Sequence, residues 1–482
     1  MIRFFVLALL VLSGFSIAAG DWTFQNFSGV CQAGRAEGEL WDNALGWNRF
    51  DFNWSKLEPQ PGKWDEAEFN RLCERVLVLR RKGVDVLPVL CYCPAWAVTS
   101  GTVEFVHDKR KKIFVPLGDN AYQETIYKTN AKGEWEKEKV KEKVLNPRLP
   151  IRADQIPQWE NFVRRVVQRL SAPPYGIKYF QVWNEASPKS GFWEGKLDDY
   201  VRDIHLPAAK VIRASGGHVV YGGWPDCESI SGLIALFDRH SLWRSIDVAD
   251  CHYFALKDML RLRQAAKERG FPNLAIWQTE IGFHSKYYYV PAFYPAALHW
   301  ALGEFPAQPD AVKVFFFAYG SPANPEAYGY GKCLRIGDKL SPHGQALKTL
   351  GDLFRHDPIR IFTGFECRPL PSGIRPLGFS AGKRLIIAFD FKEGLDGFLK
   401  KHPDGMIEVS FSGLTPDAVA VAEKVDAFGD RGGLAVAAGS AGKGTAVKIL
   451  LAGKTPSGSR GQIPLLAGVP YREMFYVVLQ LK

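Results

Sequence analysis

The chain has 482 residues, of which 46% are hydrophobic, as in a globular protein with room for one large domain and a smaller module. Its formal net charge is +10, with basic groups at residues 109–112 and 137–143. Glutamates interrupt the second group, solvated surfaces explain both groups, and we find no nucleic-acid-binding motif, so nucleic acid is not an expected partner.

The first 20 residues, MIRFFVLALLVLSGFSIAAG, predict an export signal. One arginine precedes an apolar run of about a dozen residues, which is too short to span a membrane comfortably, and small residues follow it. We expect cleavage before a mature chain that begins near Ala19 or Asp21, with an uncleaved anchor as the alternative. The sequence thus predicts a secreted or periplasmic protein without a membrane span.

From Gly29 onward, short apolar segments alternate with amphipathic ones, which is typical of an α/β fold with a parallel sheet. One helix is expected within residues 57–83, with Phe69, Leu72, Val76 and Leu79 on its apolar face, and others at 155–170 and 256–270. Strands are expected at residues 28–34, 46–54, 84–96, 177–185, 218–226, 245–254, 274–280 and 311–320. This alternation predicts a (β/α)8 TIM barrel over residues 21–354, with its active site at the carboxyl ends of the strands.

A long segment, about residues 98–150, follows the third expected strand. It is polar and rich in turn residues, and Asn130 to Gly133 form the expected tip of a hairpin. A loop of this length on the catalytic side of a barrel usually shapes the substrate cleft, so we expect the segment to wall one side of it. The alternative is that this segment is a surface insertion without a role in substrate binding.

Two of the expected strands end in glutamate. The segment IKYFQVWNE ends at Glu185, and LAIWQTE ends at Glu280. In one barrel both carboxyl groups would face the same site, where one acts as acid and base while the other attacks the anomeric carbon of a sugar. A salt bridge at the end of a strand explains either glutamate alone, but the pair favours catalysis.

The Asn-Glu pair that closes one strand, with a second glutamate closing a later strand, resembles the clan A glycoside hydrolases. These are retaining enzymes on a (β/α)8 barrel, and families 39, 5 and 42 are the most similar. The resemblance extends from about Gly29 to Gly320. It implies that Glu185 is the acid/base and Glu280 the nucleophile. It also implies that Arg49 supports the nucleophile and that Asn184 binds the 2-hydroxyl of the sugar.

The sixth and eighth expected strands depart from the family pattern. The family often has His, any residue and Tyr in the sixth strand, where this chain has His252-Tyr253-Phe254. Only alternate residues of a strand face inward, so we expect that His252 and Tyr253 do not both reach the site. The eighth strand lacks the common tryptophan and offers Ala318 and Tyr319 instead.

Aromatic side chains stack on sugar rings, and several directly follow an expected strand. Candidates for substrate binding on this ground are Trp96, Trp193, Trp224 and Tyr319, each of which packing would explain equally well. Trp54 and Trp277 lie nearer the strand interiors, and we expect them in the core. His252 and Tyr253 complete the candidate binding residues.

The eight cysteines show no zinc-type spacing, since one residue separates Cys91 from Cys93. We predict no structural metal and no cofactor. Disulfides are an option in an exported protein, but several cysteines lie in apolar strands, where a small buried side chain fits better.

Beyond about Phe354 the chain reads as β-structure, with segments at 360–369, 383–391, 405–413, 445–453 and 474–482. They predict a C-terminal β-sandwich over residues 355–482, with a structural role favoured over carbohydrate binding. The favoured function is a secreted retaining hydrolase of neutral β-glycans, with acidic glycans as a weaker option. An inactive glycan-binding barrel, an inverting hydrolase and a transglycosylase are the alternatives.

Overall fold

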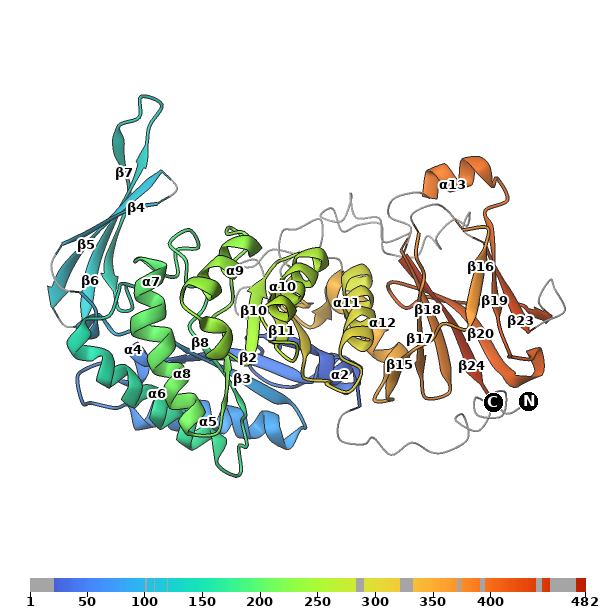
Figure 1. The fold of residues 1–482 in the computed structure, drawn as a ribbon, viewed down its shortest axis with the longest axis horizontal. Coiled ribbons are helices and arrows are strands. Elements are labelled where there is room, and N and C mark those ends of the chain that lie inside the picture. Colours follow the sequence, from blue (N-terminus) through green and yellow to red (C-terminus); the bar gives the residue numbers. More distant parts are fainter. Residues whose placement is uncertain are drawn as a thin grey trace.

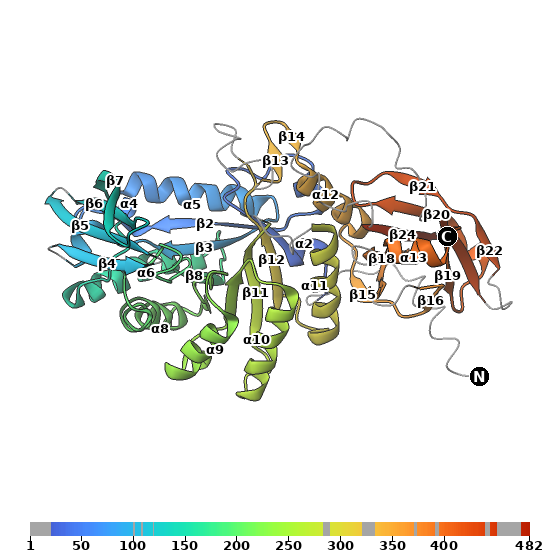
Figure 2. The same ribbon diagram turned by 90° about the horizontal axis from the view of Figure 1, so that it is seen from above.

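A computed structural model describes residues 21–99, 102–107, 109–118, 120–282, 290–320, 333–370, 374–390, 395–438, 444–450 and 474–482. The expected export signal, residues 1–20, lies outside the described residues. Within them, every helix is too short or too polar to cross a lipid bilayer. Figures 1 and 2 show a barrel in the middle of an elongated molecule, with an inserted sheet at one end and a sandwich of sheets at the other.

Eight parallel strands close into a barrel, as the sequence predicts. They pair in the cyclic order β1-β12-β11-β10-β9-β8-β3-β2. Their bounds are β1 (Ser28–Cys31), β2 (Trp47–Asn53), β3 (Asp85–Cys91), β8 (Tyr179–Val182), β9 (His218–Val220), β10 (Val248–His252), β11 (Ala275–Ile281) and β12 (Val312–Phe316). Each predicted strand is confirmed, and the carboxyl ends of all eight meet at one mouth.

Helices surround the barrel (Figure 2). Their apolar side chains are buried in the core that they share with it. The longer ones are α5 (Glu66–Arg81), α6 (Ile156–Ser171), α8 (Leu206–Ala214), α9 (Ile230–Arg239), α10 (Leu256–Glu268), α11 (Val290–Glu304) and α12 (Pro342–Phe354). Short helices are α2 (Phe24–Phe27), α3 (Leu40–Asn43), α4 (Trp54–Leu57) and α7 (Leu197–Asp199). In α5 the predicted apolar face is buried, and Asp65 caps the first turn by accepting from the backbone N–H of Glu68.

Aromatic side chains fill the barrel near the amino ends of its strands. Trp47 and Trp277 pack at 5.6 Å between ring centroids, and both contact Phe315. The buried ammonium group of Lys313 lies 4.4 Å from the Trp47 ring centroid and 2.9 Å from a carboxylate oxygen of Asp310. This packing closes one end of the barrel, so polar groups gather at the other. The core positions expected for Trp54 and Trp277 are confirmed.

The segment after β3 forms a four-stranded antiparallel sheet, where the sequence predicts a turn-rich loop. Its strands are β4 (Val103–His107), β5 (Arg110–Gly118), β6 (Ala121–Thr129) and β7 (Trp135–Val144), paired in that order. The predicted hairpin tip is confirmed by the hydrogen bond from Asn130 N–H to the Glu134 carbonyl, at 2.9 Å. Phe114, Tyr122 and Ile126 are almost fully buried, because alternate residues of β5 and β6 supply one apolar face.

The C-terminal part is the predicted β-sandwich. One sheet has the order β15 (Ile359–Ile361), β17 (Leu377–Ala381), β18 (Arg384–Asp390), β24 (Met474–Leu481), β20 (Val419–Asp426) and β21 (Arg431–Gly433). The other has the order β16 (Phe365–Arg368), β19 (Met406–Phe411), β23 (Thr445–Leu450) and β22 (Val436–Ala438). Buried aromatic and branched side chains lie between them, and α13 (Leu395–Lys401) lies beside them. Gln345 of α12 donates to the Phe428 carbonyl at 3.0 Å, which ties the sandwich to the barrel.

All eight cysteines lie within the described ranges, and all eight are free. Six of them are buried, and three of these, Cys31, Cys91 and Cys251, lie in barrel strands, as expected for small apolar side chains. The option of disulfide bonds is therefore not realised in this structure.

Candidate active site

Glu185 and Glu280 lie together at the mouth of the barrel. Glu185 stands three residues after the end of β8, and Glu280 is the next-to-last residue of β11. One carboxylate oxygen of each and one ring nitrogen of His252 all lie within 4.8 Å of one another. The two glutamates are 9% and 6% exposed, so both carboxyl groups sit in a largely dry environment that is still open to a ligand.

The backbone turns sharply after β8 and directs Glu185 into the mouth. Trp183 and Glu185 both adopt the left-handed conformation, with φ of 71° and 47°. Such backbone strain in residues other than glycine is often found at functional sites. Hydrogen bonds from the N–H of Trp183 to the Leu90 carbonyl and from the N–H of Glu185 to the Gly222 carbonyl hold the turn against the neighbouring strand ends.

Arg49 of β2 joins the groups that the sequence singles out. Its Nη1 lies 2.7 Å from Oε1 of Glu280, its Nη2 lies 2.5 Å from Oδ1 of Asn184, and its Nε lies 2.7 Å from Oε1 of Gln181. Burial disfavours the charge, but Glu280 and the other acidic groups nearby, Asp250 and Asp51 among them, together outweigh burial and raise the pKa of Arg49. A permanent cation therefore holds Glu280 and Asn184 in fixed positions.

Tyr253 also reaches Glu280, and the expectation that His252 and Tyr253 cannot both reach the site is wrong. The Tyr253 hydroxyl donates to Oε2 of Glu280 at 2.8 Å, while His252 contacts Glu185. The alternation of side chains fails here because the pairing of β10 with β11 shifts between Asp250 and His252, and Tyr253 has a φ of 62°. Burial, and then the charge of Glu280, raise the pKa of Tyr253, so its hydroxyl stays a donor.

His252 lies between the two glutamates and a buried polar pair. Its Nδ1 is 2.9 Å from Oε1 of Glu185, and its Nε2 is 2.9 Å from Oγ1 of Thr279. Thr279 in turn donates to Asp250. Burial opposes a charge on the ring, but the carboxylates of Glu280, Asp250 and Glu185 outweigh it and raise the pKa of His252 to about 10. The ring is thus a cation at neutral pH.

The environment of Glu185 favours its protonated form. Burial raises the pKa of this carboxyl group, the hydrogen bond with His252 opposes the increase, and the charge of Glu280 adds to it. Glu280 differs, because both of its oxygens accept hydrogen bonds, from Arg49 and from Tyr253. Two carboxyl groups in such unequal surroundings suit an acid and a nucleophile.

Sequence reasoning missed Gln181, Asp250, Thr279 and Asp51. Asp51 follows Arg49 by two residues in β2, so both side chains face the barrel interior. Burial raises the pKa of Asp51, and Arg49 and Glu280 are among the charges that act on it. The alternation in Arg49-Phe50-Asp51 was a signal available in the sequence.

The aromatic candidates lie in different surroundings. Trp224 is 1% exposed, its Nε1 donates to the Ser229 carbonyl, and its own carbonyl accepts from His252 N–H at 2.7 Å. This burial corrects the expectation for Trp224, which lies in the wall behind His252 and offers no face to a sugar. Trp193 is likewise fully buried. Trp96 is half-buried, with its Nε1 donating to the Glu58 carbonyl.

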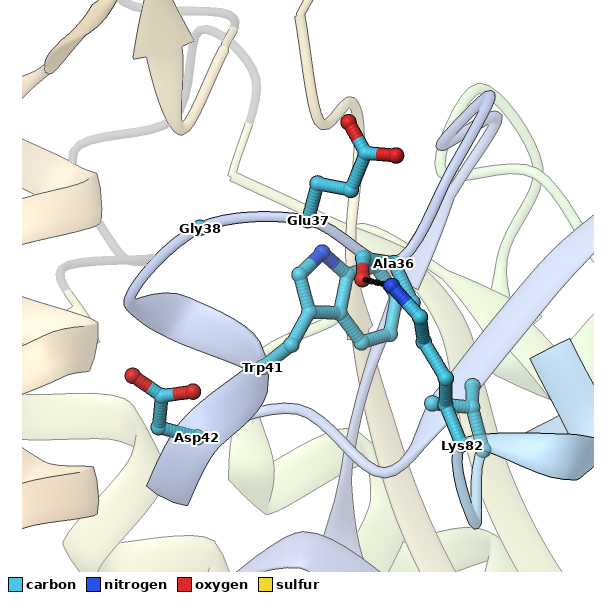
Figure 3. A pocket seen from close by; sticks show the side chains of 7 residues that line it. Ala36, Glu37, Gly38, Trp41, Asp42 and Lys82 are labelled. Carbon is cyan, nitrogen blue, oxygen red and sulfur yellow. Dashed lines mark hydrogen bonds between the residues drawn. The ribbon is translucent and has the colours of Figure 1, made fainter.

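Tyr319 lies in a surface hollow next to the mouth. Its backbone N–H donates to the Cys31 carbonyl at the end of β1, and its hydroxyl donates to the Glu37 carbonyl. The hollow has a volume of about 440 Å³ and is lined by Gly34, Arg35, Glu37, Gly38, Tyr319, Gly320, Arg335, Gly337 and Asp338. A neighbouring hollow of about 370 Å³ is lined by residues that include Glu37, Trp41 and Lys82 (Figure 3). Neither Glu185 nor Glu280 is part of its lining.

The inserted sheet contacts the segment that carries Glu185. The ammonium group of Lys112 in β5 pairs with Glu194, which follows Glu185 in the chain and is 3% exposed. Glu124 of β6 is 3.7 Å from the same ammonium group and 2.9 Å from that of Lys141. These ion pairs, in which both glutamates are buried, fix the sheet beside the mouth of the barrel.

The spacing of Glu185, His252 and Glu280 would also suit a metal ion, since each offers one ligand atom. In this structure the same atoms bond to one another and to Arg49, whose guanidinium group occupies the position next to Glu280. A cation is therefore already built into the cluster, which fits acid and base chemistry by the side chains themselves.

No protein-family model matches the chain, and no curated protein matches it in sequence. Solved structures do match. A GH30 endoxylanase from Clostridium papyrosolvens has a TM-score of 0.53 at 10% identity, over 96% of this chain and 98% of its own. A glucosidase from Croceicoccus marinus has a TM-score of 0.53 at 11% identity, over 96% and 97%. A family 39 glycoside hydrolase from Bacteroides cellulosilyticus has a TM-score of 0.51 at 13% identity, over 95% and 82%. The chain thus shares with these glycoside hydrolases the fold of a (β/α)8 barrel followed by a β-sandwich.

Proposed function

We propose that the protein is a retaining glycoside hydrolase of clan A that cleaves β-glycosidic bonds. The observation that carries the proposal is the approach of the Glu185 and Glu280 carboxylate oxygens to within 4.8 Å at the ends of β8 and β11. Retaining enzymes hold their two carboxyl groups about 5 Å apart, whereas inverting enzymes leave about 6.5–9.5 Å for a water molecule. The fold shared with three glycoside hydrolases supports the same conclusion.

In the first step, Glu280 attacks the anomeric carbon and Glu185 protonates the oxygen of the leaving group. Arg49 and Tyr253 orient Glu280 by binding one of its oxygens each. Burial supplies Glu185 in the protonated form that this step needs. Asn184, held by Arg49, is placed to bind the sugar 2-hydroxyl, a contact that strengthens in the transition state. The product is a covalent glycosyl-enzyme.

In the second step, Glu185 acts as a base. Having given up its proton, it removes one from a water molecule, which attacks the anomeric carbon and releases Glu280. The imidazolium of His252, in contact with Glu185, stabilises the carboxylate that forms between the steps. Two displacements on opposite faces restore the original configuration of the sugar.

A neutral β-glycan is the substrate class that the charges near the site favour. Arg49 is paired with Glu280, Lys189 with Glu228 at 2.9 Å, and Lys112 with Glu194. The carboxyl groups of Asp51 and Asp226 also lie close to the cluster. Among the residues that the structure describes around the site, an acidic sugar would therefore meet acidic groups and cations that are already paired. The net charge of +10 is a property of the whole protein, not of the site alone.

Export to the cell exterior or periplasm is part of the proposal, because residues 1–20 have the composition of a signal peptide. Such a location fits an enzyme that acts on polysaccharides too large to enter a cell. The test is N-terminal sequencing of the protein from the culture medium or periplasm, which should begin near Ala19 or Asp21.

The activity is tested by a screen on aryl β-glycosides and on plant, algal and glycosaminoglycan polysaccharides. Glu185→Ala and Glu280→Ala should each lower turnover by at least about 100-fold in a folded protein. Azide should then give a glycosyl azide of retained configuration with Glu185→Ala and of inverted configuration with Glu280→Ala. Glu58→Gln is a matched control, since Glu58 is also 9% exposed but binds Trp54 and Gly62. It should lower stability and spare turnover. Full activity in both alanine variants would refute the proposal.

A further inference from the structure

A chain of buried polar groups runs behind Glu185, and two of its members have no part in the two displacement steps. Nδ1 of His252 faces Oε1 of Glu185, and Nε2 faces Oγ1 of Thr279, each at 2.9 Å. The Thr279 hydroxyl donates to Oδ2 of Asp250 at 2.6 Å, and the Thr279 backbone N–H donates to Oδ1 at 3.0 Å. His252, Thr279 and Asp250 are all 0% exposed.

The surroundings leave the His252 ring one position. A Cβ atom on Gly223 would lie 2.2 Å from Nε2, so the ring fills the space of a side chain at that glycine. The backbone N–H of His252 is fixed by its bond to the Trp224 carbonyl. The contacts of the His252 ring to Glu185 and Thr279 therefore depend on the absence of a side chain at Gly223.

The donors and acceptors in this series of hydrogen bonds determine which ring nitrogen of His252 carries a hydrogen. A carboxylate only accepts, so the single hydroxyl hydrogen of Thr279 goes to Asp250. The Thr279 oxygen is then an acceptor for His252, and Nε2 must carry a hydrogen in every charge state of the ring. Nδ1 is left as the nitrogen that faces Glu185.

Acidic groups face the ring from several elements. Oδ2 of Asp250 lies 3.5 Å from Nε2, and Oε1 of Glu280 lies 3.7 Å from Nδ1. Asp226, in the segment after β9, also interacts with the ring through its charge. Within the described ranges, Arg49 is a cation in contact with this cluster, and its guanidinium is bound to Glu280. This balance of charge favours the imidazolium form.

We propose that Asp250 and Thr279 are positioning residues, which hold His252 as an imidazolium with its Nδ1–H directed at Glu185. The Asp250–His252 pair is then a buried dipole with its positive end on Glu185. It stabilises the Glu185 carboxylate against burial and so sets the pH at which Glu185 changes from acid to base. This inference rests on the proposed function, in which Glu185 performs both roles.

Asp250→Asn removes the charge and keeps the shape. We expect that without this counter-ion burial outweighs the carboxylates that stay, Glu280 and Glu185, so that the His252 ring becomes neutral near neutral pH. Glu185 loses its adjacent positive charge, so its carboxylate form becomes less stable and its pKa rises. The basic limb of the kcat/KM pH profile should move up by about one pH unit. Thr279→Val should act in the same direction, whereas Thr279→Ser, which keeps the hydroxyl, should match the wild type.

A measurement without turnover tests the same point. In ¹⁵N NMR spectra of the histidine-labelled protein, His252→Gln identifies the His252 signals. The wild type should show two protonated ring nitrogens at pH 8, and Asp250→Asn should show a neutral ring. Asp247→Asn is the matched control, since Asp247 lies one residue before β10 and binds Arg213 and the N–H of Val219. It should leave both the spectrum and the pH profile unchanged.

The inference and the proposed function fail in different ways. A neutral His252 in the wild type at pH 8, or an unshifted basic limb in Asp250→Asn, would overturn the inference and leave the two-glutamate mechanism standing. Retained turnover in both glutamate variants would remove the function, while the NMR result would still report on the ring. If Asp250→Asn does not fold, the comparison of Thr279→Val with Thr279→Ser decides the question.

Discussion

The hydroxyl of Tyr253 donates a hydrogen bond of 2.8 Å to Oε2 of Glu280. Because Arg49 binds the other oxygen, the orientation of the Glu280 carboxylate is set by one residue in β2 and one residue directly after β10. Tyr253 can do this only because the chain leaves regular strand geometry after His252. The position of the nucleophile thus depends on a local irregularity of the barrel.

Tyr253→Phe removes the hydroxyl and keeps the ring. A hydrogen bond to a charged group contributes about 1.5–3 kcal/mol, so kcat should fall by about 10- to 100-fold if the bond acts in the transition state. Thermal stability should change little, since the ring still packs. Steady-state kinetics and a melting curve measure both effects. Unchanged kcat would show that Arg49 alone positions Glu280.

Lys112→Met tests the link between the inserted sheet and the segment that carries Glu185. The substitution leaves Glu194 buried without its cation, and breaking a buried pair costs about 3–5 kcal/mol. We expect lower stability in urea denaturation and a higher KM, because the segment after Glu185 loses its anchor. Lys139→Met, at an exposed position of β7, is the control and should be neutral.

The double variant Lys112→Met/Glu194→Gln should recover part of the lost stability, since no buried charge then stays unpaired. No recovery would mean that the pair does not hold the sheet. The buried face of this sheet also changes the expectation for shortening residues 98–150. A deletion that takes away only some of the strands would expose buried side chains of those that stay, such as Phe114 and Ile126, so stability should fall along with any change in substrate preference.

The pH dependence follows from the environment of Glu185. Its pKa is raised above the ordinary value of 4.5, first by burial, so the acid form persists to higher pH than for an exposed glutamate. Activity should therefore be retained through the pH range in which an ordinary carboxyl group ionises, and it should decline as Glu185 loses its proton. Profiles of kcat/KM against pH measure this limb. In Glu185→Gln the limb should vanish, and a limb that survives would belong to another group.

The paired charges around the site predict a weak response to salt. Ionic strength screens interactions between separated charges, with a Debye length of about 8 Å at physiological strength. A neutral glycan carries no charge, so salt has no attraction between enzyme and substrate to screen. The value of kcat/KM should therefore stay nearly constant between low and high salt. A steep decline with salt would favour an acidic glycan, drawn in by the basic surface.

The barrel was predictable because its strands and helices alternate with clear spacing. Each of the eight strands formed where its apolar run predicted it, and the two glutamates lie at the strand ends. The sandwich followed from β-rich segments for the same reason. The local hydrophobic pattern is enough to predict a fold when its successive elements repeat the same pattern.

The remaining parts of the site depend on contacts that local pattern does not contain. A shift of register between β10 and β11 lets His252 and Tyr253 both reach the glutamates. Asp250 and Thr279 were missed because polar residues inside apolar strands give no sign of their partner across the sheet. Trp224 follows a strand as a sugar platform would, but the fold covers it completely.

The central claim is that Glu280 and Glu185 act together by double displacement, and the configuration of the first product tests it most directly. Proton NMR should follow cleavage of the best aryl β-glycoside from the first seconds, before the free sugar equilibrates. The spacing of the two carboxylates predicts that the β-anomer appears first and the α-anomer grows later. Initial release of the α-anomer would contradict this account, since it would require a water molecule between two carboxyl groups, one oxygen of each of which lies within 4.8 Å of the other.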